Sequence, residues 1–224
     1  MESYNTPTSS GLGISLSHYI ELSTLRTALI GLVAGSALGL GSALAADEAR
    51  PTDLVLGDKG AKCTIIEYSS LSCPHCAHFH ETVLPEIKKD YIDSGKVRMI
   101  LRDFPLNKPA FYAEKAARCA GPLKRMGFVG LYFKSQTKWV VGDPAMADEV
   151  AKIARQGGMT REEFDQCMAD KSVEQLVFAD LQEGQTKYQV EATPSFVFNG
   201  AKAISPVAGT VDEFKGWIKS NCGL

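Results

Sequence analysis

The chain of 224 residues lacks any run of basic side chains and any stripe in which basic and aromatic residues alternate. With a net charge of −2, these absences argue against a nucleic-acid partner. Internal repeats are also absent, and no low-complexity segment follows the N-terminal region. What remains is 45% hydrophobic and 22% charged residues, a composition typical of a globular protein with its own core.

The N-terminal region differs from the rest of the chain. Its first basic residue is Arg26, which precedes the apolar stretch 27–40 and a series of small residues ending at Ala46. This pattern predicts a signal peptide over residues 1–46, cleaved after Ala45 or Ala46. The alternative is an uncleaved anchor, because the apolar region approaches the lower length limit for a membrane span. Either interpretation places the remaining residues outside the cytoplasm, and we expect the periplasm.

Six cysteines are present, which are Cys63, Cys73, Cys76, Cys119, Cys167 and Cys222. An even number in an exported chain predicts disulfide bonds. The 178 residues that follow the leader (224 − 46) are enough to bury a core without such bonds. At least one cysteine pair is therefore free to take part in chemistry.

The first half of the remaining chain predicts a strand–helix–strand unit. Residues 63–68 (CTIIEY) are rich in β-branched and aromatic side chains and predict a central strand, whereas 52–56 fits an edge strand. Apolar residues recur at helical spacing over 74–91, and 97–101 (VRMIL) predicts the next strand. Two strands joined by one helix in this way form a parallel pair.

The second half is expected to be mainly helical. No clear strand occurs between residues 107 and 187, where Thr160 and Glu163 form a capping box at the start of one helix. A strand at 195–198 and the turn signal Asn199-Gly200 follow. The pattern then predicts a short partner strand and a last helix, over residues 203–205 and 212–220.

The most specific motif is Cys73-Pro74-His75-Cys76, which lies where a strand gives way to a helix. Free N–H groups and the macrodipole favour an anion at a helix N-terminus, so Cys73 is expected to react as a thiolate. Pro74 suits the first turn because it has no N–H to leave unpaired. A protonated His75 would stabilise the thiolate further. Cys76 contributes the second sulfur of the disulfide in this motif. A stabilised thiolate at Cys73 favours transfer of that disulfide to another protein.

Two other interpretations of this motif are a zinc site and an inert disulfide. A zinc site needs a second pair of ligands, and the chain has no second Cys-x-x-Cys. His78 and His80 are close in sequence, but a regular helix carries them away from its N-terminus. We therefore expect no metal ion. An inert disulfide would not need a position that activates Cys73.

Two further features, Thr193-Pro194 and Glu67, can each be interpreted in two ways. Thr193-Pro194 precedes a strand, where the proline is either an ordinary strand-start residue or a cis-proline. Glu67 shares a strand face with Ile65, which predicts a carboxylate buried at high cost in an apolar strand. The alternative for Glu67 is an edge position that faces water.

Together these residues resemble the thioredoxin-fold family, and in particular its DsbA-like branch. Four features occur in the order typical of this family, which are Glu67, Cys73-Pro74-His75-Cys76, Arg102-Asp103-Phe104-Pro105 and Thr193-Pro194. The resemblance implies an α/β class: a thioredoxin fold with a helical insertion domain. Residues 47–106 and 187–224 would form the thioredoxin part, and residues 107–186 the insertion.

The resemblance also implies roles for individual residues. Cys73 would be the exposed nucleophile and Cys76 its buried partner. Thr193 and a cis-Pro194 would form the substrate-facing loop beside the disulfide. Glu67 matches the family's buried acid, which assists proton transfer. No cofactor is expected.

Four cysteines lie outside the motif. In many relatives of this kind a pair similar to Cys119 and Cys167 forms a bridge, which the resemblance implies here; the alternative is two buried free thiols. In a thioredoxin fold, the strand that starts at Cys63 and the helix that ends at Cys222 meet at the sheet edge away from the active site. A second bridge, Cys63–Cys222, is therefore a hypothesis.

The function implied is that of a dithiol oxidase, which introduces disulfides into reduced exported proteins through a mixed disulfide at Cys73. A membrane quinone-linked protein would re-oxidise the pair, and we expect a monomer with no nucleic-acid partner. An isomerase or reductase of the same fold is one alternative, since such relatives share the threonine before Pro194. A metal-binding thiol protein using Cys73, His75 and Cys76 is an alternative from another class.

Overall fold

The computed structural model describes residues 48–205 and 209–224, which belong to one compact unit. Within these residues a sheet of order β1-β3-β2-β4 is formed. Its strands are β1 (Leu54–Leu56), β2 (Cys63–Ser69), β3 (Val97–Asp103) and β4 (Ser195–Phe198). β2 and β3 are parallel, and β1 and β4 each run antiparallel to their neighbour. The predicted parallel pair, the central strand and the edge strand are confirmed.

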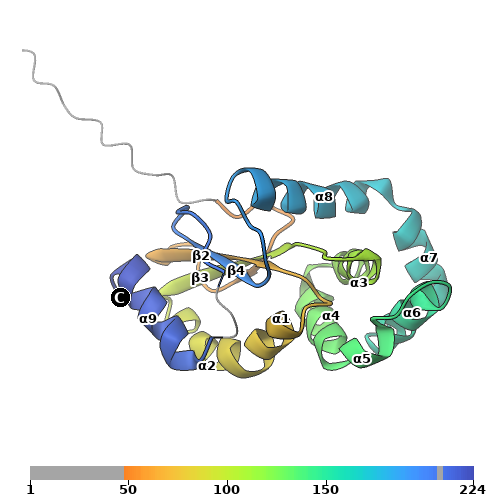
Figure 1. Ribbon diagram of the computed structural model, residues 1–224, viewed down its shortest axis with the longest axis horizontal. Coiled ribbons are helices and arrows are strands. Elements are labelled where there is room, and N and C mark those ends of the chain that lie inside the picture. Colours follow the sequence, from red (N-terminus) through yellow and green to blue (C-terminus); the bar gives the residue numbers. More distant parts are fainter. Residues whose placement is uncertain (1–47, 206–208) are drawn as a thin grey trace, which may run out of the picture. The chain divides into compact units, whose positions relative to one another are not determined.

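β2 is buried on both faces, as its nearly continuous apolar run indicates. Because side chains alternate along a strand, Ile65 and Ile66 belong to separate hydrophobic clusters on opposite faces of the sheet. Phe196 of β4 packs with Ile65, whereas Tyr68 packs with Ile66. In Figure 1, α8 (Lys171–Thr186) lies on one side of the sheet, and α1 (Pro74–His78), α2 (Leu84–Ile87) and α9 (Val211–Cys222) lie on the other.

The helical segment after β2 departs from the regular helix predicted over residues 74–91. It consists of α1 (Pro74–His78), the π-helical turn η1 (Phe79–Val83), α2 (Leu84–Ile87) and a second π-helical turn, η2 (Lys88–Ile92). Pro85 explains the first departure, because it lacks an N–H and its ring clashes with the carbonyl four residues earlier. A π-turn relieves this clash, and Leu84 N–H accordingly bonds to the carbonyl of Phe79.

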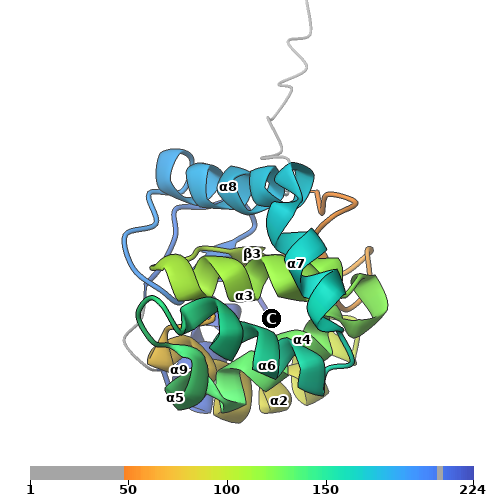
Figure 2. The ribbon, with the colours of Figure 1, turned by 90° about the vertical axis from the view of Figure 1, so that its right-hand side faces the viewer.

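The insertion after β3 is helical throughout its described length, as predicted. It comprises α3 (Lys108–Cys119), α4 (Pro122–Lys134), α5 (Gln136–Trp139), α6 (Met146–Gln156), α7 (Arg161–Ala169) and α8 (Lys171–Thr186). Several of these helices face the viewer in Figure 2. The expected capping box at Thr160 and Glu163 starts α7. Phe128 and Phe164 share one hydrophobic core with Ile65 of β2, so the insertion and the sheet bury apolar surface together.

The chain ends with α9 (Val211–Cys222), which packs against β4 and α2. Asn199 and Gly200 have positive φ angles of 49° and 77°, as a tight turn after β4 requires. The strand predicted over residues 203–205 is wrong: only Ile204 pairs, in a single bridge with Phe196. One reciprocal pair of backbone hydrogen bonds, 2.8 Å in each direction, joins these two residues.

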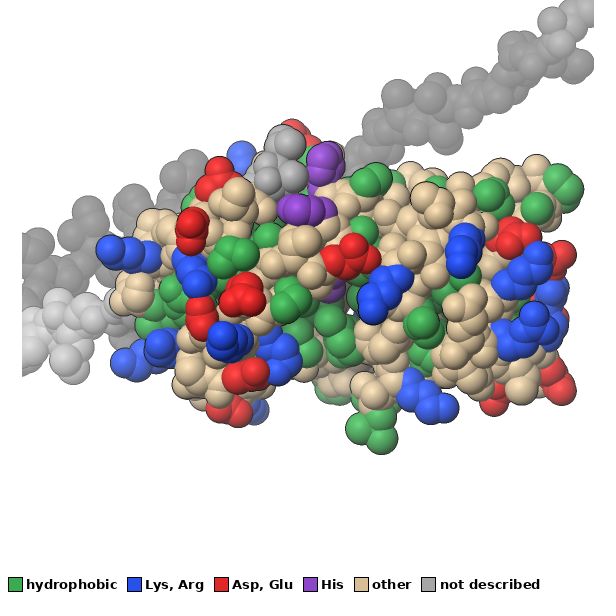
Figure 3. Space-filling model, turned by 90° about the horizontal axis from the view of Figure 1, so that it is seen from below, with side chains coloured by type: hydrophobic (Ala, Val, Ile, Leu, Met, Phe, Trp, Pro, Cys, Tyr) green, Lys and Arg blue, Asp and Glu red, His purple; other side chains and the backbone are tan. Residues whose placement is uncertain are grey.

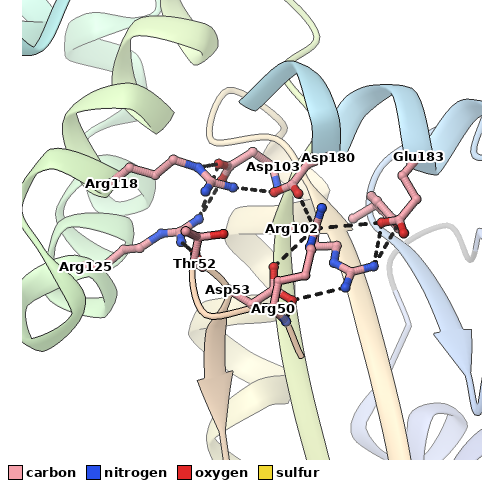
Figure 4. A network of polar contacts seen from close by, with 10 residues as sticks. Arg50, Thr52, Asp53, Arg102, Asp103, Arg118, Arg125, Asp180 and Glu183 are labelled. Atoms are coloured by element: carbon pink, nitrogen blue, oxygen red, sulfur yellow. Dashed lines mark hydrogen bonds and ion pairs between the residues drawn. The ribbon is translucent and has the colours of Figure 1, made fainter. Parts of the chain in front are cut away.

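A buried polar network joins the end of β3 to the insertion (Figure 4). Its charged members are Arg50, Asp53, Arg102, Asp103, Arg118, Arg125, Asp180 and Glu183. Arg102 bonds to Asp53 at 3.1 Å and to Glu183 at 2.6 Å. Arg118 of α3 pairs with both Asp103 and Asp180. The network thus fixes α3, α4 and α8 to the strand that neighbours β2.

The leader predicted over residues 1–46 lies outside the described residues. Among the helices that are described, none combines the length and the hydropathy needed to cross a bilayer.

Candidate functional site

The cysteine motif lies at the junction of β2 and α1. Cys73 is the N-cap of α1, with φ −83° and ψ 122°, and Pro74 occupies the first turn. The Cys73 carbonyl accepts a hydrogen bond from Ala77 N–H at 3.1 Å, and its own N–H donates to the carbonyl of Ser70 at 3.0 Å. The Cys73 sulfur therefore lies among the unpaired N–H groups of the first helical turn.

The two thiols, both reduced in this structure, differ in exposure. Cys76 is fully buried at 0% exposed, and Cys73 is 5% exposed. The expectation of an exposed nucleophile is therefore wrong, although Cys73 is the more accessible of the two. Its sulfur is covered by the loop at Thr193, whose carbonyl lies 3.3 Å from Cys73 Sγ and accepts its hydrogen bond. Pro74 and His75 are exposed beside it.

The two thiols also differ in pKa. Hydrogen bonds from Cys76, from the Thr193 side chain and from the backbone N–H groups of Cys76 and His75 lower the pKa of Cys73 from 9.0 to about 5, against the opposing effect of burial. Burial raises the pKa of Cys76 well above 9.0, and the neighbouring Cys73 and Glu67 raise it further. Near neutral pH the pair holds one proton, which resides on Cys76, and Cys73 is the thiolate.

The Thr193-Pro194 peptide bond is cis. Thr193 lies beside Cys73, as expected for a loop next to the disulfide. Its Oγ1 is buried and has no hydrogen-bond partner among the described residues when Cys73 is a thiol. The hydroxyl is therefore available to donate to the thiolate. Pro194 is buried at the start of β4.

Glu67 is 0% exposed, because β2 is a central strand, and the alternative of a water-facing edge position is wrong. It lies on the face of Ile65, toward the helical segment 74–92. Its carboxylate oxygens are 2.9 and 3.1 Å from Nε2 of His80. Sequence analysis did not predict this contact between His80 and Glu67, which forms where the helical segment is irregular. The π-turn η1 begins one residue before His80.

Sequence reasoning also missed two residues that hold the loop before α1. Gln136 Nε2 donates to the carbonyls of Leu71, at 2.8 Å, and of Cys73, at 3.0 Å. Glu114 of α3 accepts from the N–H of Leu71 at 3.3 Å, and burial raises the pKa of its carboxyl well above the ordinary value. Neither residue is part of a sequence motif. The insertion therefore supplies the contacts that fix the backbone around Cys73.

The remaining cysteines are joined in two disulfides, Cys63–Cys222 and Cys119–Cys167. The first links the start of β2 to the end of α9. The second links α3 to α7 within the insertion. Cys73 and Cys76 are the free cysteines of the structure. Across residues 48–205 and 209–224, no group of three or more His, Cys, Asp or Glu side chains has an arrangement that could hold a metal ion.

A parallel β2–β3 pair, an antiparallel β4 after a cis-proline, and a Cys-x-x-Cys pair capping α1 define the class of thioredoxin-fold proteins with a dithiol site. A family model described as "Thioredoxin" matches residues 49–220, and the chain belongs to this family. Its helical insertion makes it a DsbA-like member.

Individual relatives agree with this assignment. A Rickettsia bellii protein named "Putative protein-disulfide oxidoreductase" is 33% identical over 166 residues, which are 72% of this chain and 64% of that protein. The chain thus spans less than two thirds of that relative. The crystal structure of alpha-DsbA1 from Wolbachia pipientis is 28% identical, with a TM-score of 0.70 over 78% of this chain and 93% of that one. Oxidised BdbD from Bacillus subtilis, 23% identical, shares the fold with a TM-score of 0.67 over 81% and 99% of the two chains.

Proposed function

We propose that this protein is a thiol:disulfide oxidoreductase that introduces disulfides into reduced exported proteins. The observation that carries the proposal is the division of the pair into a stabilised thiolate at Cys73 and a buried, protonated thiol at Cys76. The proposal places the protein in the periplasm, after cleavage of the leader, as a monomer without a cofactor.

The reaction begins with the Cys73–Cys76 disulfide. A client thiolate attacks Cys73 Sγ, which forms a mixed disulfide, and Cys76 leaves as a thiolate that takes up a proton. A second client thiolate then attacks the client sulfur of the mixed disulfide, and Cys73 leaves as a thiolate. The client loses two electrons and gains a disulfide, while the enzyme pair gains those electrons.

The direction of exchange follows from the stability of the leaving group. A thiolate pKa of about 5 in place of 9.0 corresponds to stabilisation on the order of 5 kcal/mol. For a two-electron couple this is roughly 120 mV toward a more oxidising disulfide. Repeated turnover requires an oxidant, for which we propose a membrane protein linked to a quinone.

The second candidate is a reductase or isomerase of the same fold, whose Cys73–Cys76 pair another protein would keep reduced. Thr193 before cis-Pro194 is compatible with it, but the low pKa of Cys73 favours the oxidase. A metal-binding role for Cys73, His75 and Cys76 has less support. The described residues offer no third ligand near the two thiols.

The test is the reduction potential of the Cys73–Cys76 couple, measured by equilibration with glutathione, together with the oxidation of a reduced dithiol peptide. We expect a potential above about −200 mV and complete peptide oxidation by the oxidised protein. A potential near that of thioredoxin, about −270 mV, would overturn the oxidase assignment in favour of a reductase. Metal retained at one ion per chain, with unreactive Cys73, would favour the binding protein.

A further inference from the structure

The inference concerns His80, a residue with a buried side chain that the reaction steps above leave without a role. Its side chain is 5% exposed, and Nε2 contacts both carboxylate oxygens of Glu67. The other ring nitrogen, Nδ1, is buried and has no hydrogen-bond partner among the described residues. The ring packs against Phe133 of α4, with 4.6 Å between the ring centroids. A buried polar atom without a partner is costly when packing alone is the purpose of a side chain.

His80 also borders an open cavity of about 600 Å³ between η1 and α4. The other lining residues are Glu81, Pro85, Met126, Gly130, Phe133 and Lys134. A volume of this size admits several water molecules, each of which occupies about 30 Å³ in the liquid. Figure 3 shows the face of the molecule on which histidine side chains lie among hydrophobic ones. The imidazole thus lies between a carboxylate in the protein interior and a cavity that solvent can enter.

Cys76 needs such a connection to solvent. It is 0% exposed and separated from water by the surrounding core. Every time its bond to Cys73 breaks, it leaves as a thiolate and must receive a proton, and every re-oxidation must remove that proton. Glu67 is close enough for its charge to act on Cys76, yet Glu67 is itself 0% exposed. A carboxyl group without contact to water can donate its proton in every cycle only if another group supplies a new proton to it each time.

We infer that His80 is a proton-relay residue, through which Glu67 exchanges protons with water in the cavity bounded by η1 and α4. The inference rests on the proposed dithiol–disulfide exchange. When Cys76 leaves as a thiolate, His80 passes its Nε2 proton to the Glu67 carboxylate, and Glu67 passes a proton on to the Cys76 sulfur. Nδ1 of His80 takes up a proton from cavity water, and bulk solvent neutralises the hydroxide that is left. Re-oxidation reverses the three transfers, so atoms and charge balance over the cycle. An imidazole suits this role because one of its nitrogens can accept a proton while the other donates one.

The charged and titratable groups around the imidazole come from each neighbouring element. Glu67 faces it from β2, Glu81 lines the cavity from η1, Lys134 lines it from α4, and Cys76 lies on α1. His80 acts through Glu67 and does not touch the reacting sulfurs, so it is a positioning residue in the reaction and not a catalytic one.

The test compares His80→Gln with a matched control, His78→Gln. Gln keeps a donor for Glu67 but cannot relay a proton, and His78 is an exposed residue of the same helical segment whose ring contacts Thr82. The measurement is the single-turnover rate at which a reduced dithiol peptide reduces the oxidised protein, from pH 5 to pH 8. We expect His80→Gln to slow this step at least about tenfold and to change its pH profile, since positioned proton transfer typically contributes 10²–10⁴-fold. His78→Gln should match the wild type.

Two further readouts separate a relay from a structural role. Alkylation of reduced Cys73 by iodoacetamide, which needs no proton transfer to Cys76, should be unchanged within about twofold in His80→Gln. Added imidazole should restore the rate of His80→Ala in a concentration-dependent way, because it can enter the open cavity. A rate and a pH profile of His80→Gln equal to those of wild type would overturn the inference, as would a slow variant that imidazole does not rescue. If the wild type itself fails to oxidise the peptide, the proposed function fails first, whatever His80 does.

Discussion

Two regions of this molecule bury charged or ionisable side chains, and they differ in whether these side chains are paired with opposite charges. In the polar network at the end of β3, each guanidinium lies against at least one carboxylate, such as Arg102 against Asp53 and Glu183. At the dithiol site, the groups whose hydrogen bonds lower the pKa of Cys73 are a thiol, a hydroxyl and backbone N–H groups, and none of them is a cation.

The difference separates two uses of burial. Matched opposite charges resist any change of protonation, because losing one charge leaves its partner buried and unpaired. Groups without a matched partner change protonation more readily, which exchange chemistry requires. Changes to the network should therefore alter stability and leave reactivity intact. Changes to the site should alter reactivity, and their effect on stability should depend on pH through the Cys73 thiolate. The predictions below are ordered by the size of their expected effects.

The largest effect is expected for Cys73→Ser. A serine hydroxyl at this position is not ionised near neutral pH, so peptide oxidation should fall to the background rate of the buffer. At pH 5, where the Cys73 thiolate adds little to the stability of the reduced protein, the melting temperature of the variant should lie within about 2–4 °C of that of the reduced wild type, the equivalent of about 1 kcal/mol for a chain of this size. Retention of even a tenth of the activity would show that the site is elsewhere.

Arg102→Met tests the other region. The change leaves Asp53 and Glu183 without their buried cation, and we expect a loss of about 3–5 kcal/mol in the free energy of unfolding. Urea unfolding of the oxidised protein measures this loss. The control is the pKa of Cys73 in the variant, which should stay at about 5. A shift of that pKa by more than one pH unit would show that the two regions are coupled.

The pH dependence of stability provides a third test. Folding lowers the pKa of Cys73 from 9.0 to about 5, so between these values the folded reduced protein binds fewer protons than the unfolded chain. Its stability should therefore rise with pH by about 1.4 kcal/mol per pH unit and be lost as pH falls toward 5. Cys76 is protonated in both states over this range and contributes nothing to the slope.

The measurement is urea unfolding of the reduced protein at pH 5, 6, 7 and 8, with Cys73→Ala as the reference. The difference in unfolding free energy between the two proteins isolates the contribution of the Cys73 thiolate. Equal slopes for both proteins would contradict a lowered pKa at Cys73.

The smallest effect is expected for Gln136→Ala. Loss of the amide leaves the carbonyls of Leu71 and Cys73 without this donor, at about 0.5–1.5 kcal/mol for each net hydrogen bond. Loosening of the loop should lower the rate of peptide oxidation severalfold. The exposed Gln166→Ala, on α7, is the matched control. An unchanged rate would show that α5 contributes nothing to the position of Cys73.

The sequence predicted the fold because its patterns are local. The apolar run at 63–68 indicates a strand that is buried on both faces. The helical spacing of apolar residues after Cys73 indicates a helix with one face packed against the core. The prediction was wrong over the bridge at Ile204, since a single residue pair carries no pattern. It was wrong in the regularity of the helix after Cys73, where Pro85 favours a π-turn. It was also wrong about the exposure of Cys73, because the covering loop at Thr193 is 120 residues away.

By itself the sequence determined that a cysteine caps a helix after a buried strand, with a proline in the first turn. These features depend on neighbouring residues and on the short-range geometry of a helix N-terminus. The tertiary structure alone decided which groups surround the two sulfurs. Glu67, His80, Gln136 and Thr193 lie on four separate elements, and the close packing of the core brings them together. The separation of the two thiol pKa values, and with it the proposed chemistry, follows from that packing.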